Sequence, residues 1–145
     1  MMLKYANIIF VAGIFLLSSL WFVACGEDEE TMVQPAVLSL TVSPSTLYAD
    51  GISIATVRIQ GRLEGGEAIP DGTLVTVSTL KEYGNFDNGD TSIEARFRNS
   101  ETAVVFIAGT QPGYGFIGAQ MASPPLSAGA KITLLSAHVK NEPRK

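Results

Sequence analysis

The sequence has one cysteine, one histidine and one tryptophan among its 145 residues. A single cysteine cannot form an internal disulfide, and one cysteine with one histidine cannot supply the four ligands of a structural zinc site. Ten lysine and arginine residues against fourteen aspartate and glutamate residues leave no basic patch, which argues against a nucleic acid partner. No cofactor is predicted. The length predicts one domain, since ordinary domains have about 100 to 150 residues.

Helical periodicity is also missing, except near the N-terminus, where hydrophobic residues are concentrated. Twenty of the first 25 residues are hydrophobic. Lys4 precedes an apolar run over residues 8–24, which ends at Cys25 and is followed by an acidic cluster. The cluster consists of Glu27, Asp28, Glu29 and Glu30. A positive residue followed by an apolar stretch is typical of a secretory signal, so residues 1–24 are predicted to form a signal helix that directs export.

The residues before Cys25 resemble the bacterial lipobox. In lipoproteins of this kind, small residues precede a cysteine that is diacylated on sulfur, becomes the new N-terminus after cleavage and is commonly acylated there too. This chain has Phe22, Val23 and Ala24 before the cysteine, with Phe22 where the family usually has leucine. The resemblance implies acyl chains such as palmitate on Cys25, and two or more such chains anchor a protein stably in a membrane. Cys25 is then an attachment point and not a catalytic thiol.

Two other interpretations of the N-terminal segment stay open. Ordinary signal peptidase cleavage after Ala24 fits less well, because that enzyme requires a small residue where Phe22 stands. An uncleaved signal anchor is the second alternative, although seventeen apolar residues are at the short limit of the roughly 17 to 25 that span a bilayer. For a lipoprotein, Gly26 after the cysteine resembles the common sorting signal for the outer membrane, with the domain facing the periplasm or the cell surface.

Residues 25–35 are predicted to form the lipidated cysteine and an acidic tether. The segment is polar, carries four acidic residues and shows no periodicity, as a solvated linker does. The residues after the cysteine give a flexible reach of about 17 to 19 Å, and about 35 Å when fully extended. The folded part therefore stays close to the membrane. It is predicted over residues 36–139, and residues 140–145 are predicted to be a C-terminal tail.

From Ala36 onward apolar and polar residues alternate, with breaks at glycine, proline, asparagine and aspartate. Such alternation indicates half-buried antiparallel strands. Seven strands are predicted, around residues 38–42, 55–59, 75–78, 93–98, 103–108, 114–121 and 130–137. The run from Ala103 to Ala108 is almost continuously apolar, which predicts a central strand covered on both faces. About seven short strands in about 100 residues predict an all-β fold, an immunoglobulin-like β-sandwich of antiparallel strands.

Several turns and strands resemble the bacterial Ig-like domains of group 1, found in surface proteins of the invasin and intimin type. The segments that carry the resemblance are Ser43-Pro44, Ala49-Asp50-Gly51, Ala55-Thr56-Val57, Ile69 to Thr73, Val75 to Ser78 and Ala103 to Thr110. The resemblance implies a cell-envelope protein with a role in adhesion. The chain departs from those proteins in having a single copy, glycines at positions 115 and 118, and a long polar turn after Tyr83.

The polar turn over residues 85–90 is the candidate for a metal site. Asn85, Asp87 and Asp90 offer oxygen ligands of the kind that calcium prefers. The spacing differs from that of an EF-hand, and the bidentate glutamate of that motif is missing. A solvated hairpin turn built on Asn88-Gly89 is therefore the favoured interpretation, and no metal is predicted.

No catalytic residue is predicted elsewhere. Asp50 and Asp71 each precede a glycine and are interpreted as turn formers. His138 has no serine or acid partner in a nucleophile-elbow setting, so a hydrolase triad has no support. Four aromatic residues are candidates for a recognition surface, namely Tyr83, Phe86, Tyr114 and Phe116. Core packing is the competing interpretation of the same four side chains.

These features leave two hypotheses from different functional classes. The favoured one is a lipid-anchored, non-catalytic envelope module that binds another envelope protein or a polysaccharide through loops or sheet edges. The alternative is a small envelope enzyme or a carrier of a ligand or polysaccharide. A hydrolase needs a nucleophile, a base and an orienting acid together, and one histidine without a free cysteine favours the first hypothesis.

Overall fold

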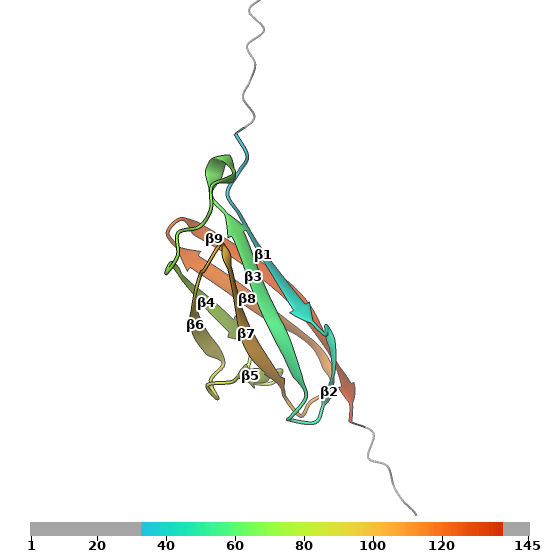
Figure 1. The fold of residues 1–145 in the computed structure, drawn as a ribbon. Coiled ribbons are helices and arrows are strands. Elements are labelled where there is room, and N and C mark those ends of the chain that lie inside the picture. Colours follow the sequence, from blue (N-terminus) through green and yellow to red (C-terminus); the bar gives the residue numbers. More distant parts are fainter. Residues whose placement is uncertain (1–32, 138–145) are drawn as a thin grey trace, which may run out of the picture. The chain divides into compact units, whose positions relative to one another are not determined.

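The computed structural model describes residues 33–137, whose fold is shown in Figure 1. This part of the chain forms nine strands and one short 3-10 turn. They are β1 (Val37–Ser43), β2 (Thr46–Ala49), β3 (Ile54–Arg62), η1 (Glu64–Gly66), β4 (Leu74–Thr79), β5 (Gly84–Phe86), β6 (Ser92–Arg96), β7 (Glu101–Ala108), β8 (Gly113–Ala122) and β9 (Pro125–Ser136). Cys25, the lipobox residues 22–24 and His138 lie outside the described residues. Within residues 33–137 no helix has the length and apolar character needed to cross a membrane.

The strands form two sheets that pack face to face. One sheet has the order β1-β3-β7-β5, and the other has the order β2-β9-β8-β4-β6. Neighbouring strands are antiparallel except β2 and β9, which are parallel. The chain passes from the first sheet to the second between Ser43 and Thr46, so β1 and β2 belong to opposite layers (Figure 1). The fold is the immunoglobulin-like β-sandwich that the alternating sequence predicts.

Apolar side chains fill the space between the two sheets. Successive residues of a strand point to opposite faces, so in β3 Ala55, Val57 and Ile59 point inward while their neighbours are exposed. Among the described residues, no polar or charged residue is buried. Phe86 and Phe106 meet in this core, with ring centroids 6.1 Å apart in an edge-to-face arrangement. Because the interior offers no polar side chain, a functional site of this domain has to lie on its surface.

All seven predicted strands form, and two short ones that were not predicted join them. β2 has four residues and β5 has three, which is too few for an alternating pattern to stand out in the sequence. β9 is longer than predicted, because it already begins at Pro125, which pairs with Ala122 across the turn between β8 and β9. β6 is shorter than predicted and ends at Arg96.

The prediction for the apolar run Ala103 to Ala108 is confirmed in one respect and wrong in another. β7 does lie in the middle of its sheet, between β3 and β5. Its inward side chains Val104 and Phe106 are buried, whereas the outward Val105 and Ile107 are only half-buried. The described sandwich has two layers, so no third layer covers the outer face of this sheet.

The turn at Asn88-Gly89 is not the predicted hairpin. β5 pairs with β7, and β6 pairs with β4, so the strands on either side of the turn belong to different sheets. The physical reason is that Phe86 and Ile93 both pack toward the core, but from opposite sheets. A two-residue hairpin would have kept both strands in one sheet. The turn therefore carries the chain across the sandwich.

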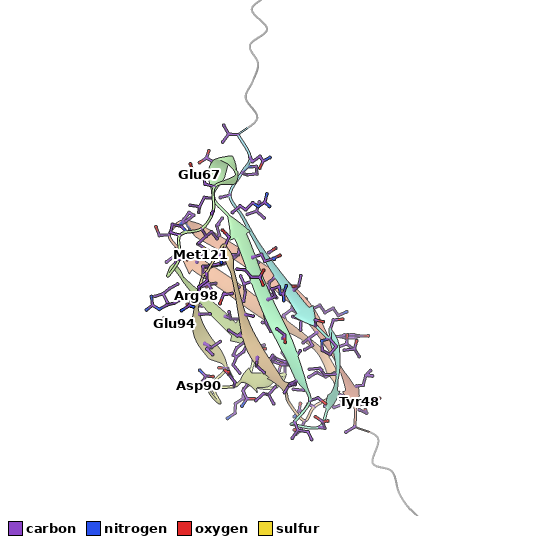
Figure 2. All side chains as sticks on the ribbon, viewed as in Figure 1. Tyr48, Glu67, Asp90, Glu94, Arg98 and Met121 are labelled. Carbon is purple, nitrogen blue, oxygen red and sulfur yellow. The ribbon has the colours of Figure 1, made fainter. Side chains whose placement is uncertain are left out.

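The loops lie at two opposite ends of the sandwich, which we call the near end and the far end (Figure 1). The near end is where the chain enters at Val33. Its loops are residues 63–73, 97–100 and 123–124. The far end contains the loops 50–53, 80–83, 87–91 and 109–112, and β9 ends there. Tyr48 and Asp90 lie at the far end and Glu67 at the near end, as Figure 2 shows.

Candidate functional site

Exposed apolar side chains gather at the far end of the domain. Ten large hydrophobic residues of the described chain are exposed, and seven of them lie in or next to the far-end half of the strands. These seven are Tyr48, Ile52, Ile54, Leu80, Tyr114, Phe116 and Leu135. The other three are Val33, Val37 and Leu74, at the near end. A concentration of exposed apolar side chains at one place marks an interaction surface more often than scattered single residues do.

Four of these residues and one lysine form what we call the aromatic face, on the outer side of strands β2, β9 and β8. The face consists of Tyr48, Tyr114, Phe116, Lys131 and Leu135. Tyr114 and Phe116 alternate along β8, and each is 64% exposed. Tyr48 is paired in register with Leu135 on the neighbouring strand. Strand alternation therefore directs all of these side chains to the same outer surface.

Lys131 supplies the positive charge of the aromatic face. It lies opposite Phe116 in the β8–β9 ladder, and its Nζ is 3.8 Å from the centroid of the Tyr114 ring. A cation at this position is attracted by the negative face of the ring. Within residues 33–137 the structure has one ion pair, between Arg58 and Glu101 on the other sheet. Among these residues Lys131 therefore contacts an aromatic ring and no carboxylate.

A bare strip and a polar strip follow the aromatic face along β8. Gly118 pairs with Gly129, and both face outward, so no side chain stands above the backbone there. The next outward position carries Gln120, which pairs with Ser127 on one side and with Thr76 on the other. The outer surface of this sheet thus changes from aromatic to flat to hydrogen-bonding within a single strand.

The outer face of the opposite sheet has a different character. Its exposed residues are mostly polar, apart from Val37 and Ile54 at opposite ends of the sheet. Near its middle Arg58 Nε lies 3.3 Å from Glu101 Oε1, and Gln60 Nε2 donates a hydrogen bond of 2.8 Å to Glu101 Oε2. An exposed ion pair of this kind contributes about 0 to 1 kcal/mol to the free energy of unfolding, and it needs no binding partner to satisfy its charges in water. Only one of the two outer faces therefore presents exposed aromatic rings.

The four aromatic candidates divide between surface and core. Tyr114 and Phe116 are exposed, as the recognition hypothesis requires. Phe86 is fully buried against Phe106, so the competing interpretation of core packing is confirmed for this residue. Tyr83 is half-buried and packs against Gly115, where a Cβ atom would stand 2.6 Å from the tyrosine ring. The glycine at position 115 thus makes room for the ring.

A polar depression of about 830 Å³ opens between the far-end loops. Its lining includes Lys81, Glu82, Asn85, Asp90, Thr91 and Gln111.

The turn over residues 87–91, beside this depression, is stabilised by hydrogen bonds of the Asn88 side chain. The side-chain oxygen of Asn88 accepts from the backbone N–H of Asp90 at 3.0 Å, and the Asn88 amide donates to the carbonyl of Ser92 at 3.1 Å. Hydrogen bonding to Glu82 raises the pKa of Tyr83 near this depression.

The calcium candidates Asn85, Asp87 and Asp90 all lie in or next to this turn. The Asn85 amide donates to the carbonyl of Gly89 at 3.4 Å. Within residues 33–137 no three histidine, cysteine, aspartate or glutamate side chains gather in a group that could hold a metal ion. Calcium binding at these three residues stays an untested alternative to the turn without metal that the sequence favours.

Asp50 and Asp71 both lie in turns, as predicted; the Asp50 carboxylate bonds within its own turn, and that of Asp71 bonds to another loop. The Asp50 carboxylate accepts hydrogen bonds from the backbone N–H of Ile52 at 2.9 Å, the backbone N–H of Ser53 at 2.6 Å and the Ser53 hydroxyl at 2.7 Å. Asp71 accepts from the backbone N–H of Asn99 at 2.7 Å. The hydrogen bonds from Ile52 and Ser53 lower the pKa of Asp50, because they stabilise the charged carboxylate.

Replacing Asp50 with asparagine is expected to lower the midpoint of thermal unfolding by a few degrees at pH 7. The folded pKa lies below the ordinary value of 3.8, so the stabilisation is present above that value and is lost as the pH falls through the folded pKa. The difference between wild type and Asp50→Asn should therefore shrink as the pH is lowered toward 3. Asp87→Asn is the control, since it removes the same charge without a side-chain hydrogen bond; a pH-independent difference for Asp50→Asn would contradict the assignment.

The sequence matches no protein-family model and no curated protein. The fold does match solved structures. The D00-D0 domains of intimin align with 74% of this chain at 14% identity and a TM-score of 0.52. A C-terminal intimin fragment, solved in complex with the intimin-binding domain of the translocated intimin receptor, aligns with 70% of this chain at 16% identity and a TM-score of 0.51.

A glycosyl hydrolase of family 2 from Bacteroides cellulosilyticus also matches, over 71% of this chain at 15% identity with a TM-score of 0.55. This chain spans 51% of the intimin D00-D0 structure, 32% of the intimin fragment and 14% of the hydrolase. At identities of this size the likeness establishes the fold: the described domain is an Ig-like β-sandwich of the type seen in intimin.

Proposed function

We propose that this chain is a lipid-anchored protein of the cell envelope whose Ig-like domain is a non-catalytic binding or structural module. The observation that carries the proposal is the placement of the aromatic face at the end of the domain opposite the entering chain. A module held at its near end presents its far end to a partner. Loops and exposed aromatic side chains on a rigid sandwich are typical of recognition surfaces.

The anchor in this proposal is Cys25, with Phe22, Val23 and Ala24 as the lipobox. Acyl chains contribute about 0.8 kcal/mol for each buried CH₂ group, so two or more chains hold the protein stably in a bilayer. Residues 25–35 then act as an acidic tether, the folded domain extends over residues 36–139, and residues 140–145 are a tail. Gly26 after the cysteine favours the outer membrane as the destination.

A binding role fits the described residues better than catalysis. The interior between the sheets buries no polar side chain, and catalytic groups gain their shifted pKa values mainly by burial and by charged neighbours. The intimin fragment binds a receptor domain, and by analogy another envelope protein or a polysaccharide is a suitable partner for this domain. A cell-adhesion role belongs to the same proposal. The hydrolase match covers 14% of that enzyme and supports the fold without supporting its reaction.

Replacing Cys25 with serine is expected to abolish labelling by radioactive palmitate, because serine offers no thiol for acylation. The measurement compares label and membrane-pelleted protein in cells that express wild type, Cys25→Ser or Phe22→Leu. The Phe22→Leu control restores the residue usual in a lipobox and should be labelled at least as well as wild type. Equal label in wild type and Cys25→Ser would end the lipoprotein proposal; an unlabelled wild type that pellets fully would favour an uncleaved signal anchor.

A further inference from the structure

The aromatic face lies in the interior of its sheet and not at a sheet edge. β8 stands between β9 and β4, and β9 stands between β8 and β2. A partner that adds a strand needs the free backbone groups of an edge. A ligand on the aromatic face therefore has to be recognised by side chains, through ring stacking, hydrogen bonds and charge.

The size of the aromatic face limits what can bind there. Its four apolar side chains and the adjacent Leu80 are each between 44% and 64% exposed. At roughly 100 Å² for each side chain they present on the order of 500 Å². A standard protein interface buries about 800 Å² on each partner, so these apolar side chains alone cover only part of one. A narrow, chain-like ligand fits the area.

The order of side chains along β8 defines the shape of that ligand. Outward residues at alternate positions are about 6.7 Å apart, so the strip from Tyr114 to Gln120 is about 20 Å long. The strip presents two rings, then the flat Gly118–Gly129 pair, then the hydrogen-bonding groups of Gln120, Ser127 and Thr76. Pyranose sugars have this same combination, since the ring faces are C–H surfaces and the ring edges carry hydroxyl groups.

The charge of the aromatic face narrows the choice of sugar. The Lys131 ammonium stands over the Tyr114 ring, and among residues 33–137 no carboxylate pairs with it. An anionic group on the ligand would pair with this ammonium at the point where the ring stacks. A neutral sugar would leave the exposed ammonium solvated by water, whereas a sugar with a ring carboxylate would also form an ion pair with it.

We infer that the aromatic face binds an acidic polysaccharide, a chain of uronic acid pyranoses. Sugar rings stack on Tyr114 and Phe116, and a ring carboxylate pairs with Lys131. Hydroxyl groups further along the chain hydrogen-bond to Gln120 and its neighbours. This inference rests on the proposed function as a binding module and specifies the partner and the surface that it uses.

Calorimetric titration of the full chain in a mild detergent tests the inference, with hexamers of polygalacturonate as the probe. The methyl-esterified hexamer keeps the rings and removes the charge, so it should bind about tenfold more weakly. Lys131→Gln should weaken binding of the acid by a similar factor and leave binding of the ester unchanged. The double variant Tyr114→Ala with Phe116→Ala should weaken both probes by more than about tenfold. Leu74→Ala, at the near end of the same sheet, is the control and should bind like wild type.

Three results would overturn the inference. Equal affinity for the acid and the ester would show that Lys131 does not pair with a sugar carboxylate. Binding that survives the double aromatic variant would show that the ligand does not use the aromatic face. Absence of binding to either probe, with far-UV circular dichroism still showing a folded wild type, would reject the sugar. If in-cell cross-linking then finds a protein partner that the double variant loses, the glycan inference fails while the proposed binding module stands. Loss of palmitate label in a glycan-binding protein would instead reject only the anchor.

Discussion

Replacing Phe106 with alanine is expected to lower the free energy of unfolding by about 3 to 5 kcal/mol. The Phe106 side chain is fully buried in the core of the sandwich, and its ring packs edge-to-face on Phe86. Truncation removes apolar contacts and leaves a cavity that a close-packed two-sheet core fills only in part. Since small domains are stable by about 5 to 15 kcal/mol, this single change is a large fraction of the total. Urea unfolding of the full chain, followed by far-UV circular dichroism, measures the effect.

Phe116→Ala is the matched control for Phe106→Ala. It removes the same ring from a side chain that is 64% exposed on the outer face. Surface substitutions of this kind usually change the free energy of unfolding by no more than about 0.5 kcal/mol. Comparable losses for the two variants would contradict the assignment of Phe106 to the core and Phe116 to the surface.

Replacing Gly84 with alanine is expected to destabilise the domain by about 3 kcal/mol or more, from steric overlap and backbone strain together. Gly84 begins β5 with a φ of 148°, in a region that other residues rarely adopt. An added Cβ would collide with the carbonyl oxygen of Ile107 and would stand 2.7 Å from the Phe106 ring. The backbone of the paired strand β7 cannot move away without breaking the β5–β7 ladder. Thermal unfolding should show a much lower midpoint.

Gly113→Ala separates the two causes of that destabilisation. Gly113 has a φ of 149°, nearly the same as Gly84, but a Cβ built there meets no atom within 4 Å. This variant therefore carries the conformational cost alone, about 1 to 3 kcal/mol. The difference between the two variants measures the collision with β7, and equal losses would show that the predicted collision is absent.

Alternation in the sequence was sufficient to predict the sandwich, because one face of each long strand is buried and the other is solvated. In the strand around Val57 and Ile59, every second residue is fully buried, and the sequence shows the same period. A single copy of an Ig-like domain with seven long strands followed from this pattern. The alternation tells which face of its own strand each residue occupies.

Pairing between strands is not contained in that pattern, and this explains the errors. Phe86 stands in a polar turn with asparagine and aspartate beside it, so the sequence around it resembles an exposed loop. It is buried because a three-residue strand pairs with Phe106, twenty residues further along the chain. The tight fit of Gly84 against β7 follows from the same distant pairing, and no local signal in the sequence indicates it.

The candidate site was predictable in part for the same reason. Tyr114 and Phe116 alternate with Gly115 and Ile117 along β8, so a strand there has to place both aromatic rings on one face. The rest of the aromatic face comes from β2 and β9. Tyr48 reaches it only because β2 leaves the first sheet and pairs in parallel with β9, a crossing that the sequence does not indicate.

The division of the first strands between the two sheets determines how the domain carries a mechanical load. A pulling force applied between Val33 at the near end and the far end of the domain would run along β1 (Figure 1). The hydrogen bonds from β1 to β3 lie across that axis over seven residue pairs, and those from β2 to β9 lie across it over four. Such a force shears the bonds of each ladder together and does not open them one at a time. Under such a force the first strands would be held by both sheets, and neither β1 nor β2 would peel from its neighbour one hydrogen bond at a time.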